Sequence, residues 1–253
     1  KLAKSEVIHF IGIGGIGMSG IAQSLIDQGY SISGSDITLN EQIANLKKSG
    51  AIIFRNQIAK NIDFIEQKFR QQKIIIIVSS AIKKNNEELI YCVKKGFLIK
   101  HRSEILSSIM KSYNSINIAG THGKTSTSTF IATLLDLCTK NSSSIIGGIL
   151  PIYKSNAYVN DSTYLVAEID ESDGSINKYH SNLGIINNID FDHCDYYSNL
   201  EDVIQSFKEF ALKSEKVLIN FDCNVTRKNI KSDFKWSIKK HNVDFALIPI
   251  EIN

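Results

Sequence analysis

Two stretches of this chain share one order of residue types: an apolar run, a glycine-rich turn and an amphipathic segment. They cover residues 7–26 and 115–138. Downstream of each, short runs rich in β-branched residues alternate with amphipathic segments, and this alternation predicts right-handed β-α-β units around a parallel sheet. The sequence therefore predicts an α/β protein with two parallel-sheet domains, the second of them cut short.

The polar residues 111–114 interrupt the alternation, and we predict a domain boundary there, with domains over residues 1–112 and 113–253. The predicted strands are Val7–Ile11, a short run ending near Gly34, Ala51–Phe54, Lys73–Val78, Phe97–Ile99, Ser115–Ala119, Thr163–Ala167, Gly184–Asn188 and Lys216–Asn220. The predicted helices are residues 18–26 with a stop at Gly29, then Glu41–Ser49, Asn86–Lys95, Ser103–Lys111, Lys124–Cys138 and Leu200–Leu212. In the helix Lys124–Cys138, Phe130, Ile131, Leu134 and Leu135 form the predicted apolar face.

Composition excludes several classes of protein. The four cysteines are scattered and form no C-x-x-C pair, which argues against a disulfide scaffold and a zinc ribbon. A net charge of +3 with interspersed charges argues against a nucleic-acid partner. The longest unbroken apolar run, Ile74–Val78, is far too short to span a bilayer, and no signal peptide is evident. These features predict a cytoplasmic protein with no nucleic-acid or membrane partner.

The first glycine turn, Gly12–Gly17, has the form G-x-G-x-x-G, and Asp36 follows Gly17 by 19 positions. Glycines allow the backbone to approach a diphosphate at a helix N-terminus, and an acidic residue at this distance can accept a ribose hydroxyl. The spacing alone favours NAD binding, although the motif specifies a diphosphate and a ribose and not nicotinamide. The alternative is a glycine turn without a ligand.

The second turn, Gly120–Thr125, resembles a P-loop but has two residues between its glycines where the standard form has four. Its backbone N–H groups could bind phosphate oxygens, Lys124 the β- and γ-phosphates, and the Thr125 hydroxyl Mg²⁺. The alternative is a polar turn that only caps a helix. A lysine at a helix start is unfavourable unless an anion neutralises it, so the pattern favours phosphate binding.

Two polar segments follow later strands. In Glu168–Asp173, four carboxylates crowd six residues, and Glu168 is best placed to reach Mg²⁺ at the sheet edge. A solvated acidic loop is the alternative, and it is the better interpretation for Asp173. In Asn187–His193, a lone histidine is not by itself a metal ligand. His193 becomes a candidate ligand because it follows a strand end in the domain that also holds the second glycine turn and the acidic segment.

Taken together, these motifs resemble one family. The ATP-dependent Mur ligases of peptidoglycan synthesis carry similar motifs in the same order, and the resemblance extends from Val7 to about Asn220. The segments that carry it are His9–Gly20, Ser33–Asp36, Ser79–Ile82, Gly120–Thr125, Glu168–Asp173 and Asn188–His193. Phe191 departs from the family's usual proline, and Ile169 from a residue that is often small.

The resemblance implies an α/β fold in which a Rossmann-like parallel-sheet domain is followed by a partial ATPase domain of the P-loop type. It further implies that the first turn holds a UDP-sugar and not NAD, and that the second domain binds ATP and Mg²⁺. The residues implied to bind the UDP-sugar are Gly14, Gly15, Ile16, Gly17, Met18, Ser19, Asp36, Ser80 and Ala81. The residues implied to bind ATP are Gly120, Thr121, His122, Gly123, Lys124, Thr125 and Ser126. The implied catalytic residues are Lys124, Glu168 and His193, and the implied Mg²⁺ ligands are Thr125, Glu168 and His193.

The activity implied by the resemblance joins L-alanine to UDP-N-acetylmuramate through an acyl phosphate, in the bacterial cytoplasm, by a monomer or weak homodimer. Family members continue into the rest of the ATPase domain and a third domain that brings the amine, so we expect this chain alone not to complete the ligation. The alternatives are a non-catalytic nucleotide-binding remnant, a sister ligase that attaches a ready-made peptide, and an NAD-dependent dehydrogenase, which leaves Gly120–Thr125 and His193 unexplained.

Overall fold

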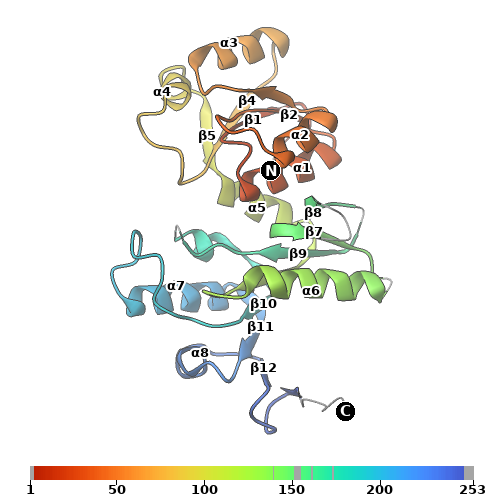
Figure 1. Ribbon diagram of the computed structural model, residues 1–253, viewed down its shortest axis with the longest axis vertical. Helices are drawn as coiled ribbons and strands as arrows, with labels where there is room; N and C mark the ends of the chain where they lie inside the picture. The colour runs from red at the N-terminus through yellow and green to blue at the C-terminus, as the bar shows by residue number, and fades with distance from the viewer. Residues whose placement is uncertain (1–2, 139, 151–154, 161, 173, 248–253) are drawn as a thin grey trace. The chain divides into compact units, whose positions relative to one another are not determined.

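The computed structural model describes residues 3–138, 140–150, 155–160, 162–172 and 174–247. The chain divides into two compact units (Figure 1). The first unit comprises Lys1–Ser108 with Ser143–Asp161, and the second comprises Ile109–Ser142 with Ser162–Asn253. Among the described residues, no helix is both long enough and apolar enough to cross a membrane.

The first unit is built on a parallel sheet of strand order β3-β2-β1-β4-β5. Its strands are β1 (Val7–Ile11), β2 (Ser31–Ser35), β3 (Ile52–Phe54), β4 (Ile74–Val78) and β5 (Leu98–His101). The helices that follow these strands are α1 (Ile16–Asp27), α2 (Glu41–Lys48), α3 (Ala59–Lys68), α4 (Glu87–Lys94) and α5 (Arg102–Met110). The chain moves outward in one direction through β2 and β3 and in the other through β4 and β5. The switch point beside β1, where ligands bind in such sheets, therefore lies at the first glycine turn.

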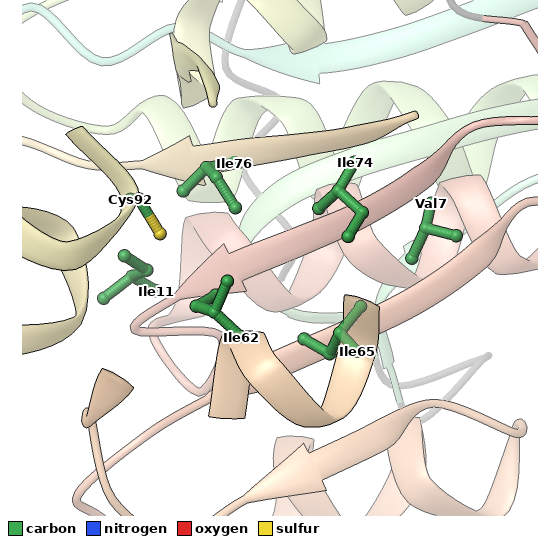
Figure 2. Close-up of a cluster of buried hydrophobic side chains, with 7 residues drawn as sticks. All are labelled: Val7, Ile11, Ile62, Ile65, Ile74, Ile76 and Cys92. Atoms are coloured by element: carbon green, nitrogen blue, oxygen red, sulfur yellow. The ribbon is translucent and has the colours of Figure 1, made fainter. Parts of the chain in front are cut away.

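A core of seven buried side chains packs α3 and α4 against the middle of this sheet (Figure 2). Its members are Val7, Ile11, Ile62, Ile65, Ile74, Ile76 and Cys92. Ile62 and Ile65 of α3 point toward β1 in this view. Burial raises the pKa of the Cys92 thiol to about 12, with a further contribution from the charge of Glu88, so Cys92 packs as a small apolar residue. The sequence pattern did not predict α3, because its buried apolar positions are few among polar neighbours.

Beneath the glycine turn, five buried polar side chains form one hydrogen-bonded network. His9 on β1 lies between two partners: its Nδ1 is 3.0 Å from Oγ of Ser33, and its Nε2 is 3.0 Å from Oε1 of Glu88. The same Glu88 oxygen accepts from Nδ2 of Asn61 at 2.9 Å, and its other oxygen accepts from the Ser35 hydroxyl. Glu88 thus ties α4 to β1, β2 and α3 through buried polar groups.

The second unit also has a parallel sheet, in which the strand order runs β13-β12-β11-β10-β6-β9. Its strands are β6 (Asn114–Ala119), β9 (Tyr164–Glu168), β10 (Ser181–Ile186), β11 (Ser214–Asn220), β12 (Phe234–Ser237) and β13 (Phe245–Ala246). Its helices are α6 (Lys124–Leu137), the 3-10 helix η1 (Ser175–Lys178), α7 (Leu200–Leu212) and α8 (Asn224–Asn229). The predicted α/β class with parallel sheets is confirmed in both units.

The predicted apolar face of α6 is wrong in part. Phe130 and Leu134 are 64% and 42% exposed, and the buried residues of this helix are Ser128 and Ala132. Small side chains allow the helix to lie close to its neighbours, β6 and β9. Hydrophobic periodicity gave weight to the larger side chains and so placed the buried face incorrectly.

A hairpin that lies between α6 and β9 in the sequence groups with the first unit. Its antiparallel strands are β7 (Ser142–Leu150) and β8 (Ser155–Tyr158), and β8 packs on α1. Nδ2 of Asn156 donates to the Ile16 carbonyl at 2.5 Å and to Oγ of Ser19 at 3.1 Å. The division of the chain at residue 112, which assigns this hairpin to the second domain, stays a prediction.

Candidate nucleotide sites

The first glycine turn leaves β1 and enters α1 without a side-chain cap. The Gly12 and Ile13 amides donate to the Ser35 carbonyl at 2.8 and 3.1 Å, which fixes the turn against the end of β2. Gly15 occupies the N-cap of α1, and no side chain accepts from the first turn of the helix. Uncapped amides and the positive end of the helix dipole suit an anion such as a diphosphate.

Asp36 shapes the turn from the end of β2. Its Oδ2 accepts from the Gly14 amide at 2.7 Å, and its Oδ1 accepts from the amide and hydroxyl of Thr38, both at 2.9 Å. A Cβ on residue 14 would lie 2.9 Å from Oδ2 of Asp36 and 2.8 Å from Cδ1 of Ile43, so a glycine is required for this approach. That Asp36 also binds a ribose hydroxyl stays a prediction.

A pocket of about 580 Å³ opens beside this turn. Six of the predicted UDP-sugar residues line it, namely Gly14, Gly15, Ile16, Met18, Asp36 and Ala81. Gly17, Ser19 and Ser80 are not among its lining residues. Ser19 is buried and its hydroxyl donates to the Ile16 carbonyl at 3.0 Å. The pocket therefore forms from the glycine turn and from the ends of β2 and β4.

The carboxamides of Asn40 and Asn86, which line this pocket, were not predicted from the sequence. Oδ1 of Asn40 caps α2 by accepting from the Ile43 amide at 3.0 Å, while its Nδ2 donates to the Gly14 carbonyl at 2.8 Å. Asn86 caps α4 in the same way, and its Nδ2 donates to Oε1 of Gln57 at 2.7 Å. An asparagine before a predicted helix was the available signal.

The second glycine turn packs on the segment that follows β10. Gly120 has a φ of +146°, and a Cβ there would lie 3.0 Å from Cβ of Asn187 and 3.3 Å from the amide nitrogens of Asn187 and Asn188. The His122 amide donates to Oδ1 of Asn188 at 2.8 Å, and Nδ2 of Asn188 donates back to the His122 carbonyl at 3.1 Å. Because β6 and β10 are neighbours in the sheet, two motifs 66 residues apart form one site.

The predicted catalytic side chains meet in two groups at the carboxyl edge of this sheet. Oγ1 of Thr125, in the first turn of α6, donates to Oε2 of Glu168 at 2.9 Å. Nζ of Lys124 lies 2.8 Å from Oε1 of Glu171, and Nε2 of His193 lies 3.3 Å from the same oxygen. His193 has a φ of +57°, which is uncommon for a residue other than glycine. Lys124, Glu168 and His193 therefore lie at one sheet edge, as the motifs predicted.

Glu171 also lies at this site, although it was not predicted as a site residue from the sequence. Its side chain is 1% exposed, and its Oε2 has no hydrogen-bond partner among the described residues. Burial raises the pKa of this carboxyl, and the charge of Lys124 opposes that shift. Glu171 belongs to the acidic run in which the sequence favoured Glu168, and Asp173, the last of that run, lies outside the described residues.

The donor set suits Mg²⁺ in the presence of a nucleotide. Among the described residues, no group of three His, Cys, Asp or Glu side chains is arranged to hold a metal ion by itself. The Thr125 hydroxyl and the Glu168 carboxylate are oxygen donors of the kind that Mg²⁺ accepts alongside phosphate oxygens and water. Ser126 is exposed in the same helical turn.

These two sites define a class of protein: an α/β chain in which a glycine turn with a pocket beside it precedes a P-loop-type turn. Residues 7–114 match the family model described as "Mur ligase family, catalytic domain", and residues 118–247 match the one described as "Mur ligase middle domain". The chain belongs to the Mur ligase family.

Several curated relatives carry one name, UDP-N-acetylmuramate–L-alanine ligase. The protein of that name from Prochlorococcus marinus subsp. pastoris strain MED4 is 59% identical over 254 residues, which are 100% of this chain and 54% of the relative. The one from Synechococcus sp. strain CC9605 is 40% identical over 253 residues, again 100% of this chain and 54% of the relative. The chain thus spans about half the length of these relatives.

Solved structures agree on the fold. The UDP-N-acetylmuramate–alanine ligase of Thermotoga maritima superposes with a TM-score of 0.82 at 27% identity, covering 92% of this chain and 53% of that one. A ligase from Neisseria meningitides for UDP-N-acetylmuramate and L-alanyl-γ-D-glutamyl-meso-diaminopimelate gives a TM-score of 0.82 at 21% identity and covers 91% of this chain and 78% of its own. The second likeness concerns the fold alone.

Proposed function

We propose that this chain carries the UDP-sugar site and the ATP–Mg²⁺ site of a ligase that joins L-alanine to UDP-N-acetylmuramate in peptidoglycan synthesis. The observation that carries the proposal is the pairing of Lys124 and Thr125, in a P-loop-type turn, with carboxylates of the loop after β9. The relatives named for this activity support it over their shared half. We place this reaction in the bacterial cytoplasm. We further propose that the protein acts as a monomer or weak homodimer.

In this reaction, a carboxylate oxygen of the sugar's lactyl group bonds to the γ-phosphorus of ATP, and the bond from that phosphorus to the leaving ADP oxygen breaks. The alanine amine then attacks the acyl phosphate, an amide forms, and phosphate leaves as the amine loses a proton. Lys124 would pair with the β- and γ-phosphates. Thr125 and Glu168 would hold one Mg²⁺, and His193 would help to hold a second metal ion; such ions would neutralise charge on the phosphates. The protein's part is positioning and charge neutralisation.

The first unit discriminates between the two ligand classes that its glycine turn allows. We expect UDP-N-acetylmuramate to bind the chain and NAD not to bind, because the family's diphosphate turn serves a UDP-sugar and the pocket beside it is lined by polar carboxamides. Calorimetric titration of the chain with each ligand measures this directly. Tight NAD binding with no response to the UDP-sugar would favour the dehydrogenase and contradict the ligase proposal.

Replacing Glu168 by alanine tests the metal half of the second site. We expect the Mg²⁺-dependent part of ATP affinity to fall at least about tenfold, since the loss of even outer-shell partners costs roughly 10–100-fold in metal affinity. The unit should stay folded, because Glu168 lies at the sheet edge and not in the core. Glu215→Ala, at an exposed position on β11, is the matched control. Equal Mg²⁺ dependence in both variants would remove Glu168 from the metal site.

A further inference from the structure

The ammonium group of Lys124 is fully engaged by acceptors of the chain itself. Its Nζ donates to the Gly120 carbonyl at 2.7 Å, to the Thr121 carbonyl at 3.3 Å and to Oε1 of Glu171 at 2.8 Å. A lysine ammonium has three N–H donors, so these three acceptors use all of them. A phosphate oxygen can bind Lys124 only by taking the place of one of these partners.

Of the three acceptors, Glu171 is the one that resembles a phosphate. The two carbonyls belong to the glycine turn itself, whereas the Glu171 carboxylate is an anion from a different loop. The backbone of Glu171 is fixed, because its carbonyl accepts from the Tyr197 hydroxyl at 2.8 Å and from the Gly174 amide at 3.0 Å. Its side chain is 1% exposed and its Oε2 has no hydrogen-bond partner among the described residues.

The same oxygen also lies close to the imidazole of His193. Nε2 of His193 lies 3.3 Å from Oε1 of Glu171, and the imidazole is presented by a backbone with a φ of +57°. Lys124 is at the start of α6 and His193 follows β10, so Glu171 is the one side chain among those described here that contacts both. The Glu171 carboxylate therefore occupies a position that would suit a phosphate group bound between Lys124 and His193.

We propose that Glu171 is a positioning residue that acts as a stand-in for phosphate: its carboxylate holds Lys124 and His193 in place, and a nucleotide phosphate must displace it from Lys124. This inference rests on the proposed function, because it takes the nucleotide that binds at Gly120–Thr125 to be ATP. Its consequence is that the wild-type chain binds nucleotide less tightly than its phosphate contacts alone would allow.

The decisive variant is Glu171→Gln, which keeps the shape and one acceptor oxygen but removes the charge. Hydrogen bonds to charged partners are roughly twice as strong as neutral ones, so we expect MgATP to bind about fivefold more tightly to this variant than to the wild type. Asp170→Asn is the matched control, because it removes an equal charge from the neighbouring residue, whose Oδ1 accepts from the Ser172 amide at 3.0 Å. We expect less than a twofold change from the control.

A second measurement reports on Lys124 without a nucleotide. Amine labelling of the ligand-free chain, followed by mass spectrometry, should modify Lys124 severalfold faster in Glu171→Gln than in the wild type, and the exposed Lys140 equally in both. If Glu171→Gln fails to fold, Glu171→Asp shortens the side chain and should also speed labelling of Lys124.

The outcomes separate this inference from the proposal on which it rests. Tighter MgATP binding and faster Lys124 labelling, confined to the Glu171 variants, would support the stand-in role. If the wild type binds MgATP but the Glu171 variant binds it equally, or both acidic variants gain equally, the stand-in role is wrong while the ATP site stands. If the wild type binds no MgATP, both the proposed function and this inference are wrong.

Discussion

The Lys124→Ala variant should bind MgATP about 100-fold more weakly than the wild type, or worse, with the affinity for UDP-N-acetylmuramate unchanged. The substitution removes the one lysine of the P-loop-type turn, whose ammonium would make charge-assisted hydrogen bonds to the phosphates. Two such bonds are worth roughly 3 kcal/mol or more, which corresponds to about 100-fold in affinity. The pocket that we propose for the UDP-sugar is formed wholly by residues of the first unit and should not respond.

Calorimetric titration with each ligand measures both affinities on one preparation. Lys140→Ala is the matched control, because Lys140 is an exposed residue beyond the other end of α6. Removing Lys124 also leaves Glu171 buried without its cation, so thermal unfolding must show that the variant is folded at the titration temperature. Nucleotide affinity that survives in a folded Lys124→Ala chain would mean that Gly120–Thr125 only caps a helix.

The second large effect concerns stability. Replacing Glu88 by alanine should destabilise the first unit by about 3–5 kcal/mol, because the side chains of His9, Ser35 and Asn61 would lose a buried partner. The neighbouring Glu87 is exposed on the same helix and makes a 3.2 Å contact with the Ala59 amide. The Glu87→Ala control should cost less than about 0.5 kcal/mol.

Because the chain has two units, global unfolding need not be two-state, and amide hydrogen exchange is the better measurement. Peptides that cover β1 and β4 should exchange about 150- to 5,000-fold faster in Glu88→Ala, while peptides from β6 and β10 keep their protection. If both glutamate variants exchange alike in β1, the buried network contributes nothing to the stability of the first unit.

The sequence by itself determined the elements whose pattern is local. The continuous apolar runs Val7–Ile11 and Ile74–Val78 are the central strands β1 and β4, buried along nearly their whole length. The two glycine turns lie between strand and helix as predicted, since a turn that requires glycine is encoded within a few residues. Lys124, Thr125 and Glu168 were proposed as site residues in the same way, because each adjoins such a turn or a strand end.

Only the tertiary structure decided which polar groups meet inside the protein. Glu88 and Glu171 look like ordinary acidic residues in the sequence, yet one is buried against His9 and the other against Lys124. The hairpin β7–β8 groups with the first unit, although it lies within the second in sequence. Burial and pairing of this kind depend on contacts between residues dozens of positions apart, and hydrophobic periodicity and motif spacing carry only short-range information.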